Sequence, residues 1–280
     1  NGGLIPKTFN VLMGGPGTGK TLIMGHMAAA YLSQGKNVLY ITMEMAEERI
    51  SERIDANLLN VPIKDIENLS QDMYNQKIEK LRKKTDGKLI VKEYPTSQAG
   101  VAHFRHLLNE LKLKKDWAPD IIFVDYLNIC MSSRFKFGAN VNSYTYIKSI
   151  AEELRGLAVE REVILISATQ VNREGFGSSD IAMENVSESF GLPATADLFL
   201  GIIVNEELQE LNQIMIKQLK NRYNDPTENS KFVLGVDRNK MRLYDCEQKA
   251  QEDIDDGPAF DNSNFGGRDA GKDFSGIKVL

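Results

Sequence analysis

The segment GGPGTGKT at residues 14–21 constrains this 280-residue chain more than any other part of its sequence. It fits the pattern G-x-x-x-x-G-K-[ST], whose glycines let backbone N–H groups turn inward around the oxygens of a phosphate. An apolar run at residues 9–13 precedes it, and a helical pattern at residues 21–32 follows it. The helix would direct the positive end of its dipole at the same phosphate. The segment therefore predicts a phosphate-binding loop between a strand and a helix.

The loop residues expected to enclose the phosphates are Gly15, Pro16, Gly17, Thr18, Gly19, Lys20 and Thr21. Lys20 should reach the β- and γ-phosphates of ATP, and the Thr21 hydroxyl should ligate Mg²⁺. A chance match to the pattern is expected in about one of a hundred chains of this length, given ordinary residue frequencies. The neighbouring strand and helix supply a context that a chance match lacks, so ATP and Mg²⁺ are the predicted ligands.

Apolar runs alternate with helical patterns through the first 170 residues. Strands are expected at residues 9–13, 37–42, 89–93, 121–124 and 163–168, and helices at 21–32, within 46–85, at 101–115 and at 146–161. Because the strands are apolar throughout, both faces of the sheet should be covered by helices, which is typical of a parallel α/β sheet. Four further strands are expected without intervening helices at residues 198–204, 214–219, 232–237 and 241–244. They predict antiparallel strands that extend one edge of the sheet.

Three polar residues stand where expected strands end. Asp125 closes one apolar run, and Glu44 and Gln170 each follow another. The carboxyl ends of parallel strands form the ligand edge of an open sheet, so these side chains are expected beside the phosphate loop. Asp125 is predicted to hold Mg²⁺, Glu44 to polarise the water that attacks the γ-phosphate, and Gln170 to contact that phosphate and report its loss. The competing interpretation is that each is an ordinary polar residue of a turn or loop.

Glu44 has two nearby competitors for the catalytic role, Glu47 and Glu48. Both have the spacing of solvated helix residues. Glu44 is preferred because apolar Met43 and Met45 flank it, which predicts a partly buried carboxylate.

The charge is unevenly distributed along the chain. The net charge is −5, and residues 247–280 hold eight acidic and four basic side chains, which leaves −5 − (−4) = −1 for residues 1–246. A near-neutral body neither supports nor excludes nucleic-acid binding. Residues 247–280 combine glycines, acids and isolated phenylalanines without an apolar period, so a disordered tail is expected after a domain at residues 1–246. No run approaches the roughly 20 apolar residues that a membrane span needs.

Several short motifs, in their order and spacing, resemble those of DnaB-type replicative DNA helicases, including the helicases of T-even-like bacteriophages. Besides the phosphate loop, the motifs are NGGL at 1–4, MEM at 43–45, DYL at 125–127, QVNR at 170–173, SES at 187–189 ahead of AD at 196–197, and KNR at 220–222. The resemblance extends over about residues 2–245. It implies a RecA-like P-loop ATPase fold and a cytoplasmic protein, in the host cell if the source is a phage.

The resemblance also implies a homo-hexameric ring around single-stranded DNA, with ATP bound between neighbouring subunits. Arg222 matches the arginine finger that reaches across the interface, and Lys220 stands two residues before it. Alternate residues of an extended segment face the same way, so both side chains could point at one phosphate. The competing interpretation is a basic cluster on the surface.

Two long loops, at residues 132–143 and 173–193, leave the expected ligand edge. In the resembling family, loops at these positions line the central channel. The residues expected to contact DNA are Arg134, Lys136, Arg173, Ser187, Glu188 and Ser189. Cations hold the phosphates of a single strand and aromatic rings stack on its bases, which suits the RFKF segment at residues 134–137. The alternative for that segment is that it packs against a neighbouring subunit. The alternative for Arg173 is that it contacts the nucleotide. The family usually has arginine where this chain has Ser187.

Two other functions remain open for such a chain. One is a RecA-like recombinase that forms an open filament on DNA, and the other is a non-motor P-loop ATPase that acts as a scaffold. The pairing of DYL with QVNR favours the helicase motor. The acidic tail is expected to bind a primase, a helicase loader or another replication protein.

Overall fold

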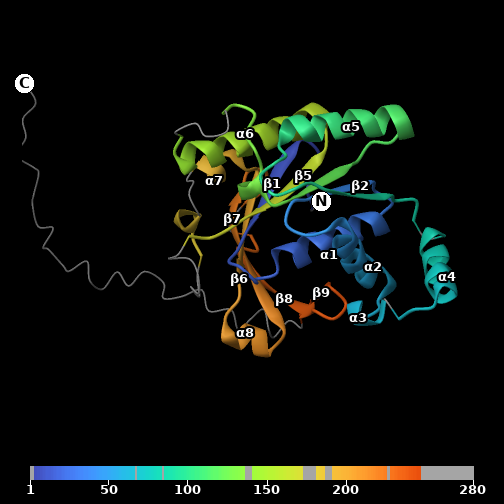
Figure 1. Cartoon of the computed structure of the whole chain (residues 1–280). Helices are drawn as coiled ribbons and strands as arrows, with labels where there is room; N and C mark the ends of the chain where they lie inside the picture. The colour runs from blue at the N-terminus through green and yellow to red at the C-terminus, as the bar shows by residue number, and fades with distance from the viewer. Residues whose placement is uncertain are drawn as a thin grey trace, which may run out of the picture.

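The computed structural model of the chain describes residues 3–66, 68–83, 85–135, 141–172, 181–186, 191–225 and 228–246. These residues form one sheet of nine strands with helices on both faces (Figure 1). The strands are β1 (Thr8–Met13), β2 (Val38–Thr42), β3 (Leu89–Glu93), β4 (Ile121–Asp125), β5 (Ile164–Thr169), β6 (Leu198–Ile203), β7 (Gln213–Asn221), β8 (Lys231–Asp237) and β9 (Arg242–Asp245). The helices are α1 (Lys20–Ser33), α2 (Glu47–Leu59), α3 (Ile63–Ile66), α4 (Gln71–Arg82), α5 (Val101–Lys115), α6 (Ser143–Arg161), α7 (Gly191–Thr195) and α8 (Glu206–Glu210), with 3₁₀ turns at Leu127–Ile129 and Met183–Asn185.

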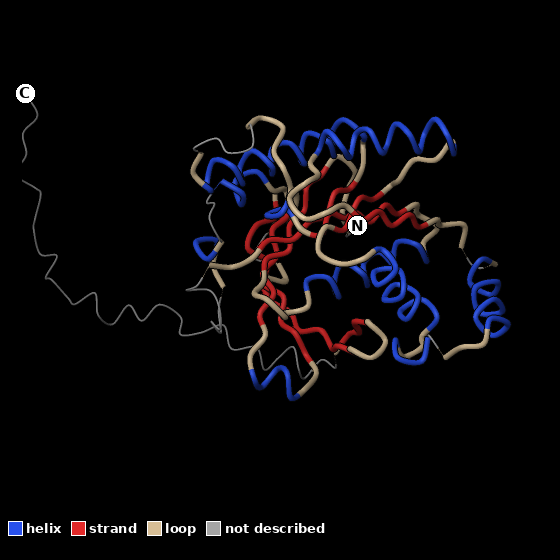
Figure 2. Tube along the Cα trace, viewed as in Figure 1, coloured by secondary structure: helices blue, strands red, loops and turns tan. Residues whose placement is uncertain are grey.

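The strand order is β3-β2-β4-β5-β1-β6-β7-β8-β9. Figure 2 shows the strands in red with helices in blue on either side of them. The first six strands in this order are parallel, and β7, β8 and β9 join them as antiparallel strands. The order reverses around β1, and open α/β sheets bind ligands at such a switch point. The phosphate loop follows β1, so the topology places it at this position.

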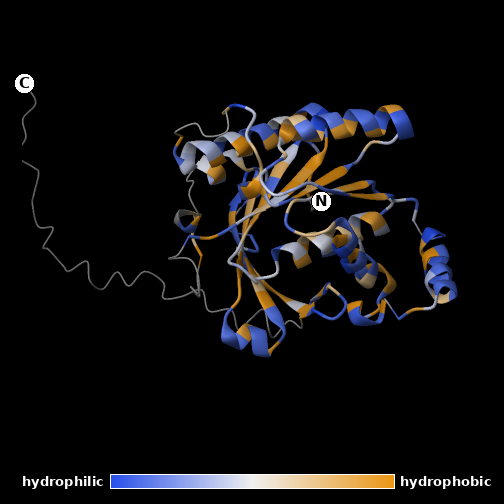
Figure 3. Ribbon diagram, in the orientation of Figure 1, coloured by the Kyte–Doolittle hydropathy of each residue, from blue (hydrophilic) through white to orange (hydrophobic). Residues whose placement is uncertain are grey.

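Two hydrophobic layers hold the helices to the sheet. Alternate residues of a strand point to opposite faces, and in β1 the side chains of Phe9, Val11 and Met13 pack on the layer under α5 and α6, while Leu12 packs on the layer under α1 and α2. The centre of the sheet is correspondingly apolar, whereas α4 and α8 are mostly hydrophilic (Figure 3). The parallel strands are therefore continuous apolar runs in the sequence, because both of their faces are buried.

Most expected elements are confirmed. The strand at residues 89–93 and the helix at residues 101–115 have the predicted bounds, and the other elements differ by at most three residues at an end. Within residues 46–85 the chain forms α2, α3 and α4, and α3 begins directly after Pro62. The mainly parallel α/β sheet with added antiparallel strands at one edge is confirmed.

One expectation about the last four strands is wrong. β6 pairs parallel to β1, and the short helix α8 separates β6 from β7, so only β7, β8 and β9 are antiparallel. A parallel pair needs a crossover of a dozen or more residues. The stretch between Thr169 and Leu198 is long enough for such a crossover. However, it holds no long helical pattern that would indicate one in the sequence.

The predicted tail at residues 247–280 lies outside the described residues. None of the described helices combines the length and the apolar character that crossing a membrane requires.

Candidate functional site

The phosphate loop joins the end of β1 to the start of α1. Gly17 and Gly19 have φ of 74° and 98°, a region that side chains with a Cβ rarely adopt, so both positions require glycine. α1 begins at Lys20, directly after this turn. The Lys20 ammonium donates to the carbonyl oxygens of Gly14 at 3.0 Å and Gly15 at 2.8 Å. The loop thus has the curved form that can surround a phosphate, with the lysine folded over it.

Asp125 ends β4 beside this loop and is buried. Its Oδ2 atom accepts hydrogen bonds from the Thr21 hydroxyl at 3.0 Å and from the Tyr40 hydroxyl at 3.0 Å. Burial raises the pKa of the Asp125 carboxyl, although these two hydrogen bonds act in the opposite direction. Burial also lowers the pKa of the Lys20 ammonium, and the nearby carboxylates of Glu44 and Asp125 oppose that effect. The Tyr40 hydroxyl therefore helps to hold the Asp125 carboxylate within hydrogen-bond distance of the Thr21 hydroxyl.

Glu44 lies two residues beyond β2 and lines the same pocket. The expectation of a partly buried carboxylate is wrong, because Glu44 is exposed while Met43 is buried. The two methionines do not cover it, since the chain leaves the sheet here and Glu44 becomes part of the pocket lining. Glu47 is engaged elsewhere: its carboxylate accepts from the Glu93 backbone N–H at 3.1 Å.

Gln170 follows β5 and completes the set at the ligand edge. Its amide Nε2 donates to the Tyr126 hydroxyl at 3.0 Å. Tyr126 directly follows Asp125, through a cis peptide bond. One hydrogen bond therefore connects the chain leaving β5 with the chain leaving β4, and both lead into the long loops.

Most of the residues predicted for the phosphate loop, together with Glu44 and Gln170, line one pocket of about 390 Å³. It is lined by Pro16, Gly17, Gly19, Lys20, Thr21, Leu22, Glu44, Arg53, Gln170, Arg238 and Met241. This volume lies in the range of roughly 300–1,000 Å³ that is usual for small-molecule sites. Arg53, Arg238 and Met241 were missed in the sequence, because α2 and the β8–β9 turn carry no motif and reach the pocket only through tertiary packing.

The residues at this edge fit a nucleotide with its metal ion. Mg²⁺ prefers oxygen ligands and is usually held by one or two protein oxygens together with phosphates and water. The Thr21 hydroxyl and the Asp125 carboxylate supply two such oxygens within hydrogen-bond distance of each other. The backbone N–H groups of the loop and the Lys20 ammonium suit phosphate oxygens.

Lys220 and Arg222 lie elsewhere, at the end of β7. The Lys220 ammonium donates to the carbonyl oxygens of Pro193 at 2.8 Å and Ala194 at 2.9 Å, and an Arg222 N–H donates to Ala194 O at 3.4 Å. The two side chains therefore point to the same place, as their alternate spacing predicts. Arg222 also donates to Asp197 Oδ1 at 2.7 Å.

The strand register separates this pair from the phosphate loop of its own chain. Leu198 of β6 pairs with Asn10 on one side and with Asn221 on the other, at the amino end of the parallel strands. Gly14 is four residues further along the chain than Asn10, which is roughly 13 Å at about 3.3 Å per residue. Lys220 and Arg222 thus lie away from the pocket of their own chain and do not line it.

Asp197 holds Arg222 in place. This buried carboxylate also accepts from Arg155 of α6 at 3.2 Å and from the Phe9 backbone N–H at 3.0 Å. Arg155 remains as a partner for the carboxylate if Arg222 is replaced, so the loss of Arg222 leaves no unpaired buried charge.

Among the residues expected to contact DNA, only Arg134 is described. Its guanidinium pairs with the Glu152 carboxylate of α6. The turn before it is anchored, because the carboxylate of Glu153 accepts from Ser132 and Ser133. Lys136, Arg173, Ser187, Glu188 and Ser189 lie outside the described residues.

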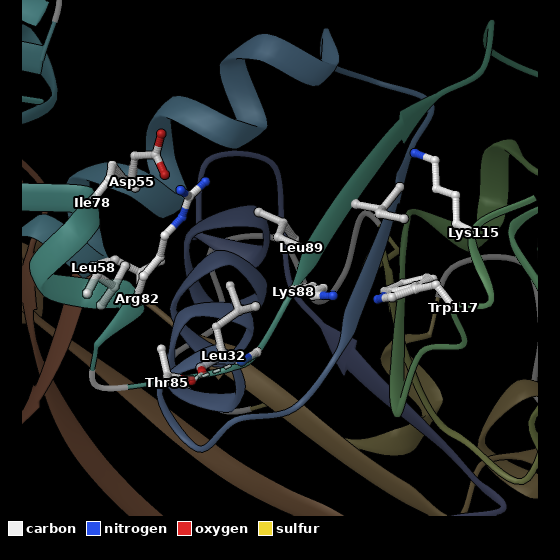
Figure 4. A pocket seen from close by; sticks show the side chains of 13 residues that line it. Leu32, Asp55, Leu58, Ile78, Arg82, Thr85, Lys88, Leu89, Lys115 and Trp117 are labelled. Carbon is white, nitrogen blue, oxygen red and sulfur yellow. Dashed lines mark hydrogen bonds between the residues drawn. The ribbon is translucent and has the colours of Figure 1, made fainter. Parts of the chain in front are cut away.

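A second pocket, of about 490 Å³, lies between α4, the end of α1 and the edge strand β3 (Figure 4). Its lining includes apolar side chains such as Leu32 and Leu89, and the cations of Arg82, Lys88 and Lys115. The indole Nε1 of Trp117 is buried there without a hydrogen-bond partner among the described residues. No residue of the phosphate loop or of the ligand edge lines it.

Known proteins are similar to this chain in sequence and in fold. The family model of the DnaB-like helicase C terminal domain matches residues 1–233. The DnaB-like replicative helicase of Enterobacteria phage T4 is 51% identical over 250 residues, which cover 88% of this chain and 52% of that protein. The replicative DNA helicase DnaB of Helicobacter pylori is 27% identical over 189 residues, which cover 66% of this chain and 37% of that protein. This chain therefore spans about half the length of the T4 relative, and less of the other.

Two solved structures share the fold at 17% sequence identity. One is an ATPase domain that aligns with a TM-score of 0.72 over 88% of this chain and 87% of that chain. The other is a DnaB-like replicative helicase, whose structure was described together with its interactions with primase. It aligns with a TM-score of 0.71 over 87% of this chain and 58% of that chain.

Proposed function

This chain belongs to the family of DnaB-like helicase C-terminal domains, and on that premise we propose that it is the ATP-driven motor of a replicative DNA helicase. The motor moves along single-stranded DNA and separates duplex strands as a homo-hexameric ring in the cytoplasm of the host cell. The observation that carries the proposal is that two groups of residues matching the motifs of the family lie at two different edges of the sheet. The phosphate loop with Asp125, Glu44 and Gln170 occupies one edge, and Lys220 and Arg222 face the other.

In this proposal the residues of one subunit bind ATP and prepare its hydrolysis. The loop N–H groups bind the phosphates, and Lys20 moves from the carbonyl oxygens of Gly14 and Gly15 to the β- and γ-phosphates. Thr21 and Asp125 would hold Mg²⁺, which when bound would neutralise charge on the phosphates. Glu44 accepts a proton from the attacking water, and its exposure in the pocket leaves it accessible to that water.

The neighbouring subunit supplies the positive charge that its partner's pocket needs in the transition state. Arg222 and Lys220 direct their cations together and away from their own pocket, which is the arrangement a trans-acting finger requires. Gln170 contacts the γ-phosphate and transmits its loss through Tyr126 to the loops after β4 and β5. Arg134, Lys136, Arg173, Ser187, Glu188 and Ser189 of these loops contact the DNA strand. The acidic segment at residues 247–280 binds a primase, a loader or another replication protein.

DNA-dependent ATP hydrolysis tests this function. The wild-type chain should hydrolyse ATP faster when single-stranded DNA is added, and it should separate a forked duplex only when ATP and Mg²⁺ are present. Lys20→Ala is the matched control, because it removes the phosphate-facing ammonium and should abolish both activities without unfolding the chain. ATP hydrolysis that ignores DNA would favour a non-motor ATPase, and filaments instead of rings in electron micrographs would favour a recombinase.

A further inference from the structure

A buried carboxylate of α6 holds the start of the loop that follows β4. Only 8% of Glu153 is exposed, and both of its carboxylate oxygens accept hydrogen bonds from Ser132 and Ser133. The Ser132 hydroxyl donates to Oε1 at 2.5 Å, and the Ser133 hydroxyl donates to Oε2 at 2.6 Å. The Ser133 backbone N–H lies 3.1 Å from each oxygen. One short stretch of chain therefore occupies both oxygens of the carboxylate.

The same contacts determine where Arg134 leaves this turn. The Arg134 backbone N–H donates to the Ser132 hydroxyl oxygen at 3.2 Å, and that hydroxyl donates in turn to Glu153. The Tyr146 hydroxyl, which also comes from α6, accepts from the Ser132 backbone N–H at 3.2 Å. The backbone of three successive residues, 132–134, is thus tied to α6.

We propose that Glu153 is a positioning residue for DNA binding, which fixes the start of this loop and so sets the place where Arg134 meets a phosphate of single-stranded DNA. The inference rests on the proposed function, in which Arg134 contacts the strand. Burial of a carboxylate costs free energy unless its oxygens are hydrogen-bonded. The partners of Glu153 are hydroxyl and N–H groups of one turn, so its charge strengthens the hydrogen bonds that define that turn.

The preceding residue, Glu152, differs from Glu153 in its surroundings. Its carboxylate is partly exposed and pairs with the guanidinium of Arg134, and Lys148 lies 4.0 Å from the same carboxylate. Exposed ion pairs contribute little to stability, so the guanidinium can exchange Glu152 for a DNA phosphate. The backbone of Arg134 stays in place during that exchange, because Glu153 holds it through Ser132. Neighbouring carboxylates of α6 thus fix the backbone of Arg134 and leave its side chain able to change partners.

DNA binding by the full chain tests the inference, measured as the fluorescence anisotropy of a labelled oligothymidine in the presence of a non-hydrolysable ATP analogue. Glu153→Gln keeps the shape of the side chain, but its amide nitrogen cannot accept a hydrogen bond from either serine. The Kd for the oligonucleotide should rise about tenfold, the scale of a lost hydrogen bond to a charged group. ADP binding should stay within about twofold of the wild type, because Glu153 does not line the nucleotide pocket.

The salt dependence of DNA binding separates positioning from a general loss of stability. The logarithm of the affinity falls with the logarithm of the salt concentration, with a slope of about 0.7 for each phosphate contacted in a single strand. Glu153→Gln and Arg134→Ala should both lower this slope, because both remove the same contact. The double variant should bind DNA within about twofold of Arg134→Ala alone. A change that only loosened the fold would leave the slope unaltered, and its effect would add to that of Arg134→Ala.

Glu160→Gln is the matched control, since it removes a partly exposed carboxylate from the last turn of the same helix, where it pairs with Arg105. It should bind DNA as the wild type does. Thermal melting shows whether each variant folds. If Glu153→Gln does not fold, Ser133→Ala takes its place. This variant removes one donor to the carboxylate, so a smaller rise in the Kd is expected, and no rise would overturn the inference.

An unchanged Kd and slope in a folded Glu153→Gln would also overturn the inference, as would effects that add to those of Arg134→Ala. Either result would leave the proposed function standing. A wild-type chain that does not bind the oligonucleotide would overturn the proposed function itself.

Discussion

Two carboxylates at the ligand edge differ in their surroundings, and the difference fits the separate roles proposed for them. Asp125 is buried and accepts hydrogen bonds from Thr21 and Tyr40, so its position is fixed, as a metal ligand requires. Glu44 is exposed and has no hydrogen-bond partner among the described residues, so it is free to accept a proton from water. The positions of both residues could be predicted from the ends of apolar strands. Their burial could not, because it depends on how the chain turns after each strand.

Glu44→Gln tests the role of the exposed carboxylate. The amide keeps the shape of the side chain but cannot accept the proton, so hydrolysis should fall by about 10²-fold or more. ATP binding should stay near the wild-type level, because Glu44 contacts no phosphate in the proposed mechanism. Steady-state hydrolysis and equilibrium binding measure the two effects separately.

Glu48→Gln provides the control for that variant. Glu48 is also exposed and lies outside the pocket, so its replacement should leave hydrolysis unchanged. Hydrolysis by Glu44→Gln within a few-fold of the wild type would show that another group activates the water.

At the scale of elements, the sequence pattern predicted the parallel strands because burial on both faces leaves a continuous apolar run. It could not predict the direction of β6, because the direction depends on a crossover through residues 170–197 that carries no long helical pattern. Nor could it predict that the β8–β9 turn meets α2 and α3. Those contacts join segments about 180 residues apart, and no local pattern records them.

His26 joins three elements, and its protonation should affect the stability of the fold. Its Nδ1 atom accepts from the Asn57 amide at 2.9 Å and from the Leu243 backbone N–H at 3.4 Å, so α1 binds α2 and β9 through a neutral imidazole. Burial lowers the pKa of His26, and the Arg242 charge lowers it further. The folded pKa thus lies below the unfolded value of about 6.5. The stability it contributes is complete above that value and is lost as the pH falls through the folded pKa.

Urea unfolding at pH 7.5 and pH 5.5 measures this contribution. The unfolding midpoint of the wild type should fall at the lower pH. His26→Gln, whose side-chain oxygen can still accept a hydrogen bond but does not titrate, should show a smaller fall. His106→Gln removes an exposed histidine and should behave as the wild type does. An equal fall in His26→Gln and the wild type would show that other groups cause the pH dependence.

At the scale of the whole molecule, two groups of residues that the proposed function assigns to one ATPase site lie far apart in this chain. Lys220 and Arg222 lie at the amino end of the parallel strands, and the phosphate loop lies beyond their carboxyl ends. These two side chains do not line the pocket of their own chain, which is why the proposed function has them act on the pocket of another copy. The motif at residues 220–222 could be recognised in the sequence, but its distance from the loop follows only from the strand register.

Mixing two inactive variants tests whether Arg222 completes the site of a neighbour. An arginine finger contributes about 10³ to 10⁵ to the rate of phosphoryl transfer, so Arg222→Ala should bind ATP nearly normally and hardly turn over. Lys20→Ala keeps Arg222 but has an inactive phosphate loop. In mixed rings, some interfaces pair the arginine of Lys20→Ala with the intact loop of Arg222→Ala, and these interfaces should hydrolyse ATP. The mixture should therefore hydrolyse ATP faster than either variant does alone.

The control is each variant at the same total concentration without the other variant. Subunit exchange is checked by energy transfer between labelled chains. If the subunits exchange and no ratio of the two variants gains activity, Arg222 does not act across an interface.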